Sequence, residues 1–478
     1  MKKVKYKYDP QLTRDQNHAV EHFLSSYRNF VESEQSTWCY SLSGYAGTGK
    51  TYLISELIKQ LSKHNVLVRV AVTAPTNKSV RVLCEKLQSL IPPDILDRMG
   101  VNFGTIHSFL KLYPDKKPDG TVEFRVKETN PNKIPIKQYN LVIVDECSMI
   151  GTELMNLINS TVRDKTGIVY VGDIAQLPPV ERDTISDTFA CKYQSSLCQI
   201  VRQQSENGII NLSLSIRERY HSGERTRMTH VLDHENDQVQ FVPQTQAVEM
   251  VVRDVTQSRI DSRILCYTNR AVKQYNQLIH DLIYGPDSEQ FVIGERVIVH
   301  APYMLFDTHT EVDIITGTGD MLITSEECTL VSQNPDTVHL HGHAIPIQHM
   351  RLKRDMTPES IVDVIVPDNW DSVNQLINHH FSQWRTYKNL AQNEKDPSRR
   401  RIYNQEAKQN SSAAWDLKER FLQLRHAYAM TVHKSQGSTF GRVYVDWNDV
   451  NWIRDVNMFN QCMYVAITRP ASDLFFLV

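Results

Sequence analysis

The sequence lacks the features of several protein classes. It has no run of about 18 apolar residues, so we expect no membrane-spanning helix, and its basic start, Met1-Lys2-Lys3, is not followed by the apolar stretch of a secretory signal. Its 8 cysteines are scattered without a Cys-x-x-Cys pair, which favours free, mostly buried thiols in a reducing compartment over a disulfide framework or a zinc site. Neither sign of charge dominates, because the formal net charge is −2. A uniformly basic surface is therefore excluded, and any nucleic acid must be bound in a positively charged groove.

The 478 residues, of which 41% are hydrophobic and 23% charged, are typical of a soluble globular chain of about three domains. In the first third, apolar runs alternate with helical patterns. The expected strands are 41–44, 66–73, 141–144 and 167–171, and the expected helices are 53–61 and 79–90. This alternation predicts a parallel sheet covered on both faces. A second α/β pattern begins near residue 196, with a strand at 263–268 and a helix at 271–284, and it resumes near Tyr428.

Two insertions interrupt these patterns. Asp119-Gly120 is a hairpin turn signal, which predicts a β-hairpin at residues 111–127. Residues 291–352 carry short β-like runs that predict a small antiparallel barrel, and residues 358–424 are polar and helical. The expected α/β architecture has a first domain at 1–110 and 128–195, the hairpin at 111–127, a second domain at 196–285 and 425–478, and an insertion at 286–424. We expect Trp370, Trp384 and Trp415 to be core residues rather than base-stacking ones, and Arg399-Arg400-Arg401 to be a solvated helix face.

Residues 44–51, Gly-Tyr-Ala-Gly-Thr-Gly-Lys-Thr, fit the phosphate-binding pattern G-x-x-x-x-G-K-[ST] between a strand and a helix. The glycines allow backbone N–H groups to turn toward phosphates, and the helix N-terminus adds a favourable dipole. Lys50 is expected to reach the β- and γ-phosphates and Thr51 to ligate Mg²⁺. The predicted nucleotide-binding residues are Gly44, Ala46, Gly47, Thr48, Gly49, Lys50 and Thr51.

Two carboxylates, Asp145 and Glu146, follow the apolar run 141–144. A strand-terminal carboxylate beside a phosphate-binding loop is where a Mg²⁺ partner is needed, so Asp145 is expected to hold the metal together with Thr51. Glu146 can orient and deprotonate the attacking water. The alternative is an exposed acidic turn. ATP and Mg²⁺ are the expected nucleotide and metal.

Further motifs occur in a fixed order along the chain. Ala74-Pro75-Thr76-Asn77-Lys78 and Gly104-Thr105-Ile106-His107-Ser108 come first, and the acidic motif continues as Cys147-Ser148-Met149. Residues 172–180 read Gly-Asp-Ile-Ala-Gln-Leu-Pro-Pro-Val, residues 431–437 read Thr-Val-His-Lys-Ser-Gln-Gly, and residues 464–469 read Tyr-Val-Ala-Ile-Thr-Arg. Over essentially the whole chain, this series resembles the superfamily 1B (RecD-like) DNA helicases, and within them the small Dda-like bacteriophage enzymes.

The resemblance implies a fold and several residue roles. The fold is two RecA-like P-loop domains with ATP at their interface, a hairpin pin at 111–127, and an SH3-like barrel with a helical projection at 286–424. Gln16 is the implied adenine-reading residue, with an exposed helix glutamine as the alternative, and Gln176 is the implied γ-phosphate sensor, with a loop-structural role as the alternative. Arg202 and Arg469 are implied arginine fingers, although Arg469 could instead form a surface ion pair. Gly437 and Gln436 are implied near the phosphates, and Pro470 departs from the small residue that the family often has there.

Single-stranded DNA is bound by hydroxyls, amides and cations on the phosphates and by flat side chains on the bases. Thr76 and His433 are the strongest candidates because the family motifs place DNA there, and Phe124 is the implied wedge of the pin, unless it only packs the hairpin. The full set of predicted DNA contacts is Pro75, Thr76, Asn77, Lys78, Thr105, His107, Phe124, Asn269, Arg270, Thr431 and His433.

The expected function is an ATP-dependent DNA helicase, with 5′ to 3′ movement carried over from the family. A translocase that strips proteins without unwinding, an ATP-driven binding switch and a subunit of a nuclease–helicase complex are the alternatives. The expected partners are single-stranded DNA and forked duplex DNA, with a single-strand-binding protein or other replication or recombination proteins as further candidates. We expect a monomer without membrane association in the cytoplasm, which is that of the host if a phage encodes the chain.

Overall fold

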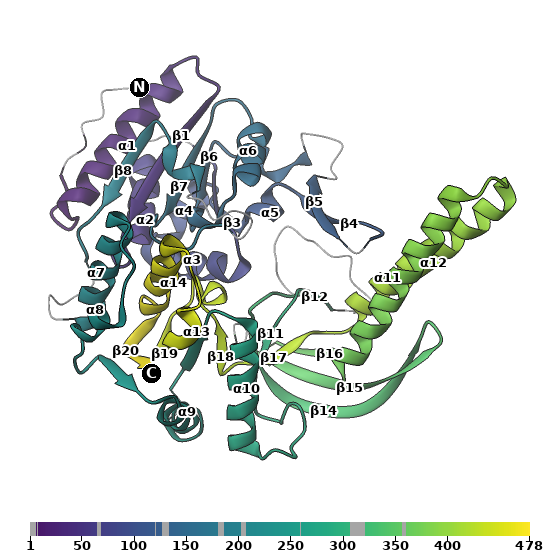
Figure 1. The fold of residues 1–478 in the computed structure, drawn as a ribbon. Helices are drawn as coiled ribbons and strands as arrows, with labels where there is room; N and C mark the ends of the chain where they lie inside the picture. Colours follow the sequence, from purple (N-terminus) through teal and green to yellow (C-terminus); the bar gives the residue numbers. More distant parts are fainter. Residues whose placement is uncertain are drawn as a thin grey trace. The chain divides into compact units, whose positions relative to one another are not determined.

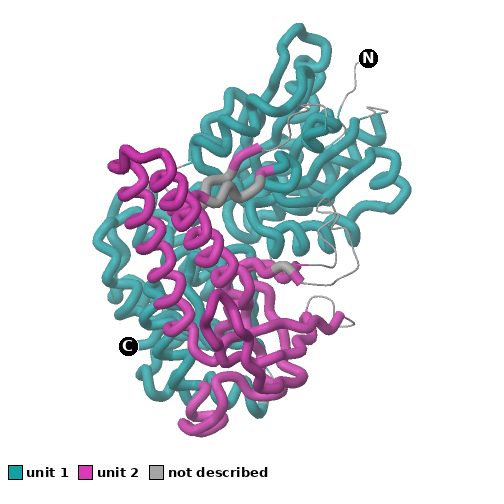
Figure 2. Tube along the Cα trace, turned by 90° about the vertical axis from the view of Figure 1, so that its right-hand side faces the viewer, with its two compact units in different colours: residues 1–111, 128–279, 428–478 teal, residues 112–127, 280–427 magenta. Residues whose placement is uncertain are grey.

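The computed structural model describes residues 6, 8–64, 68–119, 121–126, 133–179, 186–201, 207–258, 260–305, 321–355 and 360–478. The chain divides into two compact units (Figure 2). Unit 1 comprises Met1–Lys111, Glu128–Ile279 and Tyr428–Val478, and unit 2 comprises Leu112–Lys127 and His280–Ala427. Within the described ranges, no helix combines the length and the apolar character that crossing a membrane requires.

Unit 1 contains a first sheet of six parallel strands in the order β3-β2-β6-β7-β1-β8 (Figure 1). The strands are β1 (Thr37–Gly44), β2 (Val70–Ala74), β3 (Asn102–Thr105), β6 (Leu141–Val144), β7 (Thr166–Gly172) and β8 (Tyr193–Leu197). The helices of this domain include α1 (Arg14–Glu32), α2 (Lys50–Lys63), α3 (Asn77–Leu90), α4 (Pro93–Arg98), α5 (Ile106–Phe109) and α6 (Thr152–Thr161). The predicted parallel sheet is confirmed, although β2 begins at Val70 and residues 65–67 lie outside the described part of the chain.

The core of this domain follows from the spacing of apolar residues on α1. Val20, Phe23, Tyr27 and Phe30 recur at intervals of three and four, so they share one face of the helix, and all four are buried. They pack against Trp38 on β1, whose ring lies 5.3 Å from that of Tyr27 between centroids. This packing fixes the helix across the sheet and so places the start of α1 beside the end of β1.

A second parallel sheet in unit 1 has the order β18-β10-β19-β20-β9. Its strands are β9 (Val239–Val242), β10 (Ser262–Cys266), β18 (Ala429–Thr431), β19 (Phe440–Asp446) and β20 (Pro470–Leu477). Its helices are α7 (Gly208–Ser222), α8 (Met228–Leu232), α9 (Gln244–Arg253), α10 (Asn269–Tyr284), α13 (Trp447–Val450) and α14 (Val456–Ile467). The predicted strand and helix after residue 262 and the return of the α/β pattern near Tyr428 are confirmed.

Unit 2 contains a five-stranded antiparallel sheet in the order β16-β15-β14-β11-β17 and a two-stranded ribbon, β12 (Tyr303–Met304) with β13 (Met321–Leu322). The sheet strands are β11 (Arg296–Val299), β14 (Glu327–Leu340), β15 (His343–Arg354), β16 (Ile361–Pro367) and β17 (Leu424–His426). The predicted β character is confirmed, but two strands are long rather than short, with 14 residues in β14 and 12 in β15. The SH3-like description of this sheet stays a prediction.

The expectation that residues 358–424 are helical is wrong for β16. Val362, Val364 and Val366 are buried, whereas Ile361 and Asp363 are exposed, and this alternation is the period of a strand. The remainder forms α11 (Trp370–Asn393) and α12 (Pro397–Arg420), a helical pair that runs out from the sheet (Figure 1). Residues of β15 such as Ile347 pack with α11 and α12 in one apolar cluster.

The predicted hairpin is confirmed as β4 (Leu112–Lys116) paired antiparallel with β5 (Val122–Val126). It belongs to unit 2, where Trp415 Nε1 donates a hydrogen bond to the Lys117 carbonyl at 3.0 Å. Trp370 and Trp415 pack against the apolar cluster of α11 and α12, as expected for core residues, and Trp384 is half-buried. Residues 399–401 are exposed, and the 8 cysteines are free, five of them buried, as predicted.

Candidate functional site

The phosphate-binding motif lies where β1 ends and α2 begins. Gly47 and Gly49 have φ values of 81° and 79°, in the left-handed region that glycine adopts without strain. Lys50 Nζ donates to the carbonyls of Gly44 at 2.8 Å and Tyr45 at 3.1 Å, so the ammonium group lies over the loop. The sequence therefore folds into a loop of the kind that binds phosphates.

Gln16 is bound directly to this loop. Its Nε2 donates to the Thr48 carbonyl at 3.0 Å, and its Oε1 accepts from the backbone N–H of Thr13 at 3.0 Å in a capping box at the start of α1. The side chain is only 2% exposed, so the alternative of an exposed helix glutamine is wrong. One amide hydrogen and one lone pair remain for a nucleobase.

The acidic pair follows β6, which is separated from β1 by β7 alone. Because all three strands are parallel, Asp145 and Thr51 belong to the same edge of the sheet. Burial raises the pKa of Asp145 to about 7, and the carboxylate of Glu146 adds to this rise, while Lys50 opposes it. Both acids are half-buried, so an exposed acidic turn is wrong. Glu146 has a φ of 51°, a strained conformation that commonly marks functional positions.

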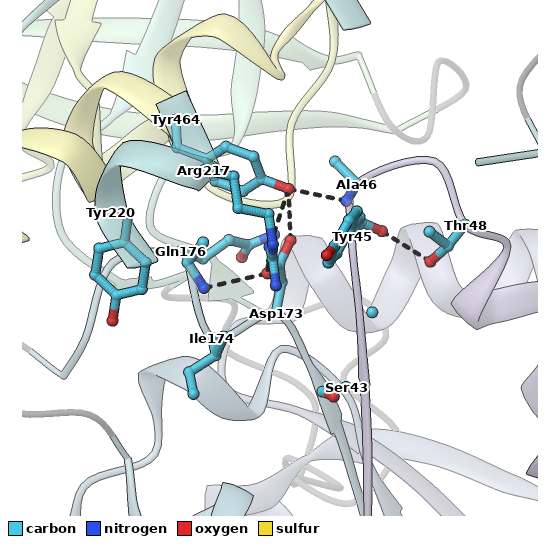
Figure 3. Close-up of polar contacts among 12 residues, drawn as sticks. Ser43, Tyr45, Ala46, Thr48, Asp173, Ile174, Gln176, Arg217, Tyr220 and Tyr464 are labelled. Atoms are coloured by element: carbon cyan, nitrogen blue, oxygen red, sulfur yellow. Dashed lines mark hydrogen bonds and ion pairs between the residues drawn. The ribbon is translucent and has the colours of Figure 1, made fainter. Parts of the chain in front are cut away.

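A second-domain tyrosine contacts both the nucleotide loop and the carboxylate that follows β7 (Figure 3). The Tyr464 hydroxyl, from α14, accepts a hydrogen bond from the Ala46 backbone N–H at 3.0 Å and donates to Asp173 Oδ2 at 2.7 Å. Arg217, from α7, pairs with Asp173 Oδ1, and its guanidinium carbon lies 3.9 Å from the centre of the Tyr45 ring. Asp173 is fully buried, so the paired arginine supplies the charge that this carboxylate needs.

Gln176 also lies at the seam between the two parallel-sheet domains, where it contacts α14. Its side chain is 5% exposed, and its carbonyl accepts a hydrogen bond at 2.9 Å from Nε2 of Gln461, on α14. The residue thus has a structural contact, and its sensor role stays a prediction.

Arg469 is 7% exposed, which makes the alternative of a surface ion pair wrong. Its guanidinium donates to the carbonyls of Val465 at 3.0 Å and Ser438 at 3.1 Å and to the Thr468 hydroxyl at 2.9 Å. These bonds hold the arginine within the second domain. Arg202, the other predicted arginine finger, lies outside the described residues.

Gly437 approaches the first domain at the start of α3. A Cβ atom built on it would lie 2.7 Å from the Ser79 hydroxyl, and its φ of 72° also favours glycine. The neighbouring Gln436 Nε2 is buried without a hydrogen-bond partner among the described residues. An amide left unpaired in this way is available to a ligand.

The predicted DNA contacts of the first domain gather at one end of the sheet. Ala74 and Thr105 are paired in register on β2 and β3, so the loops that follow these strands are neighbours. The Thr76 hydroxyl caps α3 by accepting from the Ser79 N–H at 3.1 Å, and the Thr105 hydroxyl caps α5. Of the remaining members, Asn77 is exposed, whereas Pro75, Lys78 and His107 are half-buried.

The second domain repeats this arrangement. Cys266 and Thr431 are paired in register on β10 and β18, which brings the loops before α10 and after β18 together. The His433 ring lies 6.0 Å from that of Tyr267, and Asn269 and Arg270 are exposed at the start of α10. Burial lowers the pKa of His433, and likewise that of His107. Phe124 lies on β5, but its side chain is outside the described part of the structure.

Comparison with known proteins identifies the family. Residues 11–243 match the model described as an AAA domain, and residues 426–477 match the UvrD-like helicase C-terminal domain. The ATP-dependent DNA helicase dda of Enterobacteria phage T4 is 25% identical over 454 residues, which cover 91% of this chain and 94% of that protein. The chain is a superfamily 1B DNA helicase related to Dda.

This helicase also resembles other viral and bacterial proteins. Protein R530 of Acanthamoeba polyphaga mimivirus is 25% identical, covering 92% of this chain and 95% of that protein. The RecBCD enzyme subunit RecD of Mycolicibacterium smegmatis is 30% identical over 185 residues, which cover 37% of this chain and 30% of that protein. The solved Pif1 helicase from Bacteroides aligns with a TM-score of 0.49 at 15% identity, over 98% of this chain and 92% of that one.

Arg217 and Tyr464 were not predicted as site residues of this helicase from the sequence. Arg217 lies outside every quoted motif, and its partner Asp173 is 44 positions away in the sequence. Tyr464 stands at the start of the motif that ends in Arg469. A tyrosine at that place in the motif was the one available signal, but its contact with Ala46, 418 positions earlier, could not be read from the chain.

Proposed function

We propose that this helicase hydrolyses ATP at the seam between its two parallel-sheet domains and moves 5′ to 3′ along single-stranded DNA. The observation that carries the proposal is the pair of hydrogen bonds that the Tyr464 hydroxyl makes to two different residues. Its hydroxyl joins the second domain to the Ala46 amide of the nucleotide loop and to Asp173 of the first domain. The T4 relative is an ATP-dependent DNA helicase, which agrees with this use of the site.

Within this proposal, the first domain holds the nucleotide. The loop amides of residues 46–51 and the Lys50 ammonium bind the phosphates, and Gln16 contacts the adenine with its remaining amide hydrogen and lone pair. Thr51 and Asp145 hold Mg²⁺, which neutralises phosphate charge when bound. The raised pKa of Asp145 supports this assignment, because a carboxylate that is buried beside a second carboxylate is stabilised by a cation. Glu146 orients and deprotonates the attacking water.

Both domains supply groups that respond to the γ-phosphate in this proposal. Arg202 and Arg469 are the proposed arginine fingers of the second domain, and Gln176 is the proposed sensor of the first. The unpaired amide of Gln436 lies beside Gly437 in the motif at residues 431–437. Arg469 is held by carbonyl and hydroxyl acceptors, bonds that a phosphate can replace. Closure of the seam around ATP therefore requires that ATP binds the closed arrangement more tightly than the open one.

The proposed DNA track consists of the loops after β2 and β3 in the first domain and those after β10 and β18 in the second. Ala74 is paired with Thr105, and Cys266 with Thr431, so two neighbouring loops come together in each domain. This supports two DNA-binding sites, called grips here, one in each domain. Lys78 and Arg270 are the cations of these grips, and His433 is the flat side chain of the second. Alternating the strength of the grips as the seam opens and closes moves the strand.

The proposed wedge is the hairpin β4–β5, with Phe124 stacking on the last base pair as the duplex opens. The hydrogen bond from Trp415 to Lys117 braces the turn of this hairpin from α12 and supports its use as a rigid pin. The expected partners are single-stranded DNA, forked duplex DNA and proteins of replication or recombination.

The deciding experiment is unwinding of a duplex that carries either a 5′ or a 3′ single-stranded tail. We expect ATP-dependent strand release with the 5′ tail and little with the 3′ tail. Release only from the 3′-tailed duplex would refute the polarity. ATP consumption without release from either substrate would favour a translocase that strips proteins from DNA.

A further inference from the structure

A buried cluster of three ionisable side chains lies where the chain enters and leaves unit 2. His280 lies on α10, Glu295 directly precedes β11, and His426 ends β17. Their side chains are 1%, 0% and 11% exposed. Glu295 Oε1 lies 3.2 Å from His280 Nδ1 and 2.7 Å from His426 Nδ1. A carboxylate buried this deeply requires compensating positive charge.

The surroundings of the His280 ring determine which nitrogen carries a hydrogen. Nε2 lies 3.0 Å from the Glu289 carbonyl and 3.0 Å from the Ser288 hydroxyl, whose own hydrogen is donated to the Gly285 carbonyl. Both neighbours therefore act as acceptors, and Nε2 must be the donor. In a neutral ring, Nδ1 then carries a lone pair that faces the carboxylate of Glu295. Two acceptors at 3.2 Å repel each other unless a cation lies between them.

The donor set suits a transition-metal ion. Two imidazole nitrogens and one carboxylate oxygen are ligands typical of Zn²⁺ and related divalent ions, and the three donor atoms lie within 4.8 Å of one another. A hydrogen bond from the other ring nitrogen to a backbone carbonyl, as His280 makes to Glu289, is the usual support of a metal-binding histidine. The N–H of Val292 donates to Glu295 Oε2 at 3.0 Å, which keeps Oε1 toward the two rings.

We propose that His280, Glu295 and His426 bind one divalent transition-metal ion of the Zn²⁺ class as a structural site. Three protein ligands leave a further position for water. The ion joins the segment that enters unit 2 to strand β17 by which the chain leaves it, and it reinforces the pairing of Val297 on β11 with His426. The site uses no cysteine and is separate from the proposed Mg²⁺ ligands, and it stands whether or not the chain unwinds DNA.

The first test is the zinc content of the full chain, purified from zinc-supplemented medium and freed of loose metal. We expect about one zinc per chain for the wild type and a loss of most of it in His280→Gln and in His426→Gln. His349→Gln is the matched control, because His349 is an exposed histidine of the same unit that pairs with Asp336. All of these variants keep the 8 cysteines, so zinc bound by thiols contributes equally to each and cannot account for a difference between them. Equal zinc content in the wild type and the two cluster variants would overturn the proposal.

A second measurement decides the matter even if the cluster variants do not fold. Metal-free wild-type protein is titrated with Co²⁺, and its visible absorption and melting temperature are followed. We expect one equivalent to give the bands of a nitrogen- and oxygen-ligated ion, without a thiolate charge-transfer band, and to raise the melting temperature. If Co²⁺ gives neither the absorption bands nor a thermal shift, the bridging cation is a proton on a doubly protonated His280, and the metal proposal is wrong.

Discussion

At the residue scale, the proposed role of Lys50 in nucleotide hydrolysis leads to a direct prediction. Replacing it by alanine removes the ammonium group that lies over the loop, and we expect kcat for DNA-stimulated ATP hydrolysis to fall at least about 100-fold, the range typical of a lost charge-stabilising group. The fold should survive, because within the described part of the chain the Lys50 ammonium donates only to loop carbonyls. Lys63→Ala, an exposed lysine of the same helix, is the matched control. Near-wild-type turnover in a well-folded Lys50→Ala variant would refute the assignment.

A second residue-scale prediction concerns pH. Burial lowers the pKa of His433 and His107, so the folded state binds fewer protons than the unfolded state as the pH falls through the ordinary histidine pKa of about 6.5. Stability from these groups is therefore complete above that pH and is lost below it. Melting temperatures measured between pH 7.5 and pH 5.5, at roughly half-unit steps, should fall less steeply for His433→Gln than for the wild type. Parallel curves would contradict a half-buried, neutral His433.

The part of the site that could be predicted from the sequence consists of residues that are neighbours along the chain. Lys50 and Thr51 were recognisable because the loop motif is contiguous, and its chemistry depends on local backbone conformation. The pairs Asp173–Arg217 and Ala46–Tyr464 were not, because tertiary packing alone brings them together. The buried state of Gln16 also follows from packing, since an isolated helix would leave that face to solvent.

At the scale of elements, the hairpin β4–β5 carries the proposed strand-separating role. In Phe124→Ala we expect ATP hydrolysis on single-stranded DNA to stay near the wild-type rate, whereas unwinding of a forked duplex slows several-fold, since base stacking on an aromatic ring contributes about 1–3 kcal/mol. The two activities are measured on the same preparation, so the single-strand ATPase is the internal control. Equal loss of both would show that Phe124 serves folding instead.

The elements themselves were predicted with different success. The parallel strands and the hairpin followed from apolar runs and a turn signal, which are local. Strand β16 was missed, although Val362 and Val364 alternate with polar or exposed residues, because polar helical sequence surrounds it. The length of β14 and β15 could not be read either, since the outer part of that pair is stabilised by packing in the cluster formed with α11 and α12.

At the scale of the whole molecule, the proposed communication between the two α/β domains is tested at Tyr464, whose hydroxyl bonds Ala46 and Asp173. Tyr464→Phe keeps the ring but removes the bonds to Ala46 and Asp173, each contributing about 1 kcal/mol. We expect DNA-stimulated kcat to fall by roughly 10- to 30-fold, with a much smaller change in nucleotide affinity without DNA. Tyr444→Phe is the control, because that hydroxyl bonds Asp254 of its own domain at 2.9 Å. Identical behaviour of the two variants would argue against coupling through Tyr464.

The most direct test of the whole scheme is the rate of ATP hydrolysis by the wild-type chain with and without single-stranded DNA. If nucleotide is consumed in a seam that DNA helps to close, saturating strand should raise the steady-state rate by about tenfold or more, equivalent to roughly 1.4 kcal/mol of differential stabilisation. An equal rate with and without the strand would contradict the central claim that DNA binding and ATP hydrolysis are coupled across that seam.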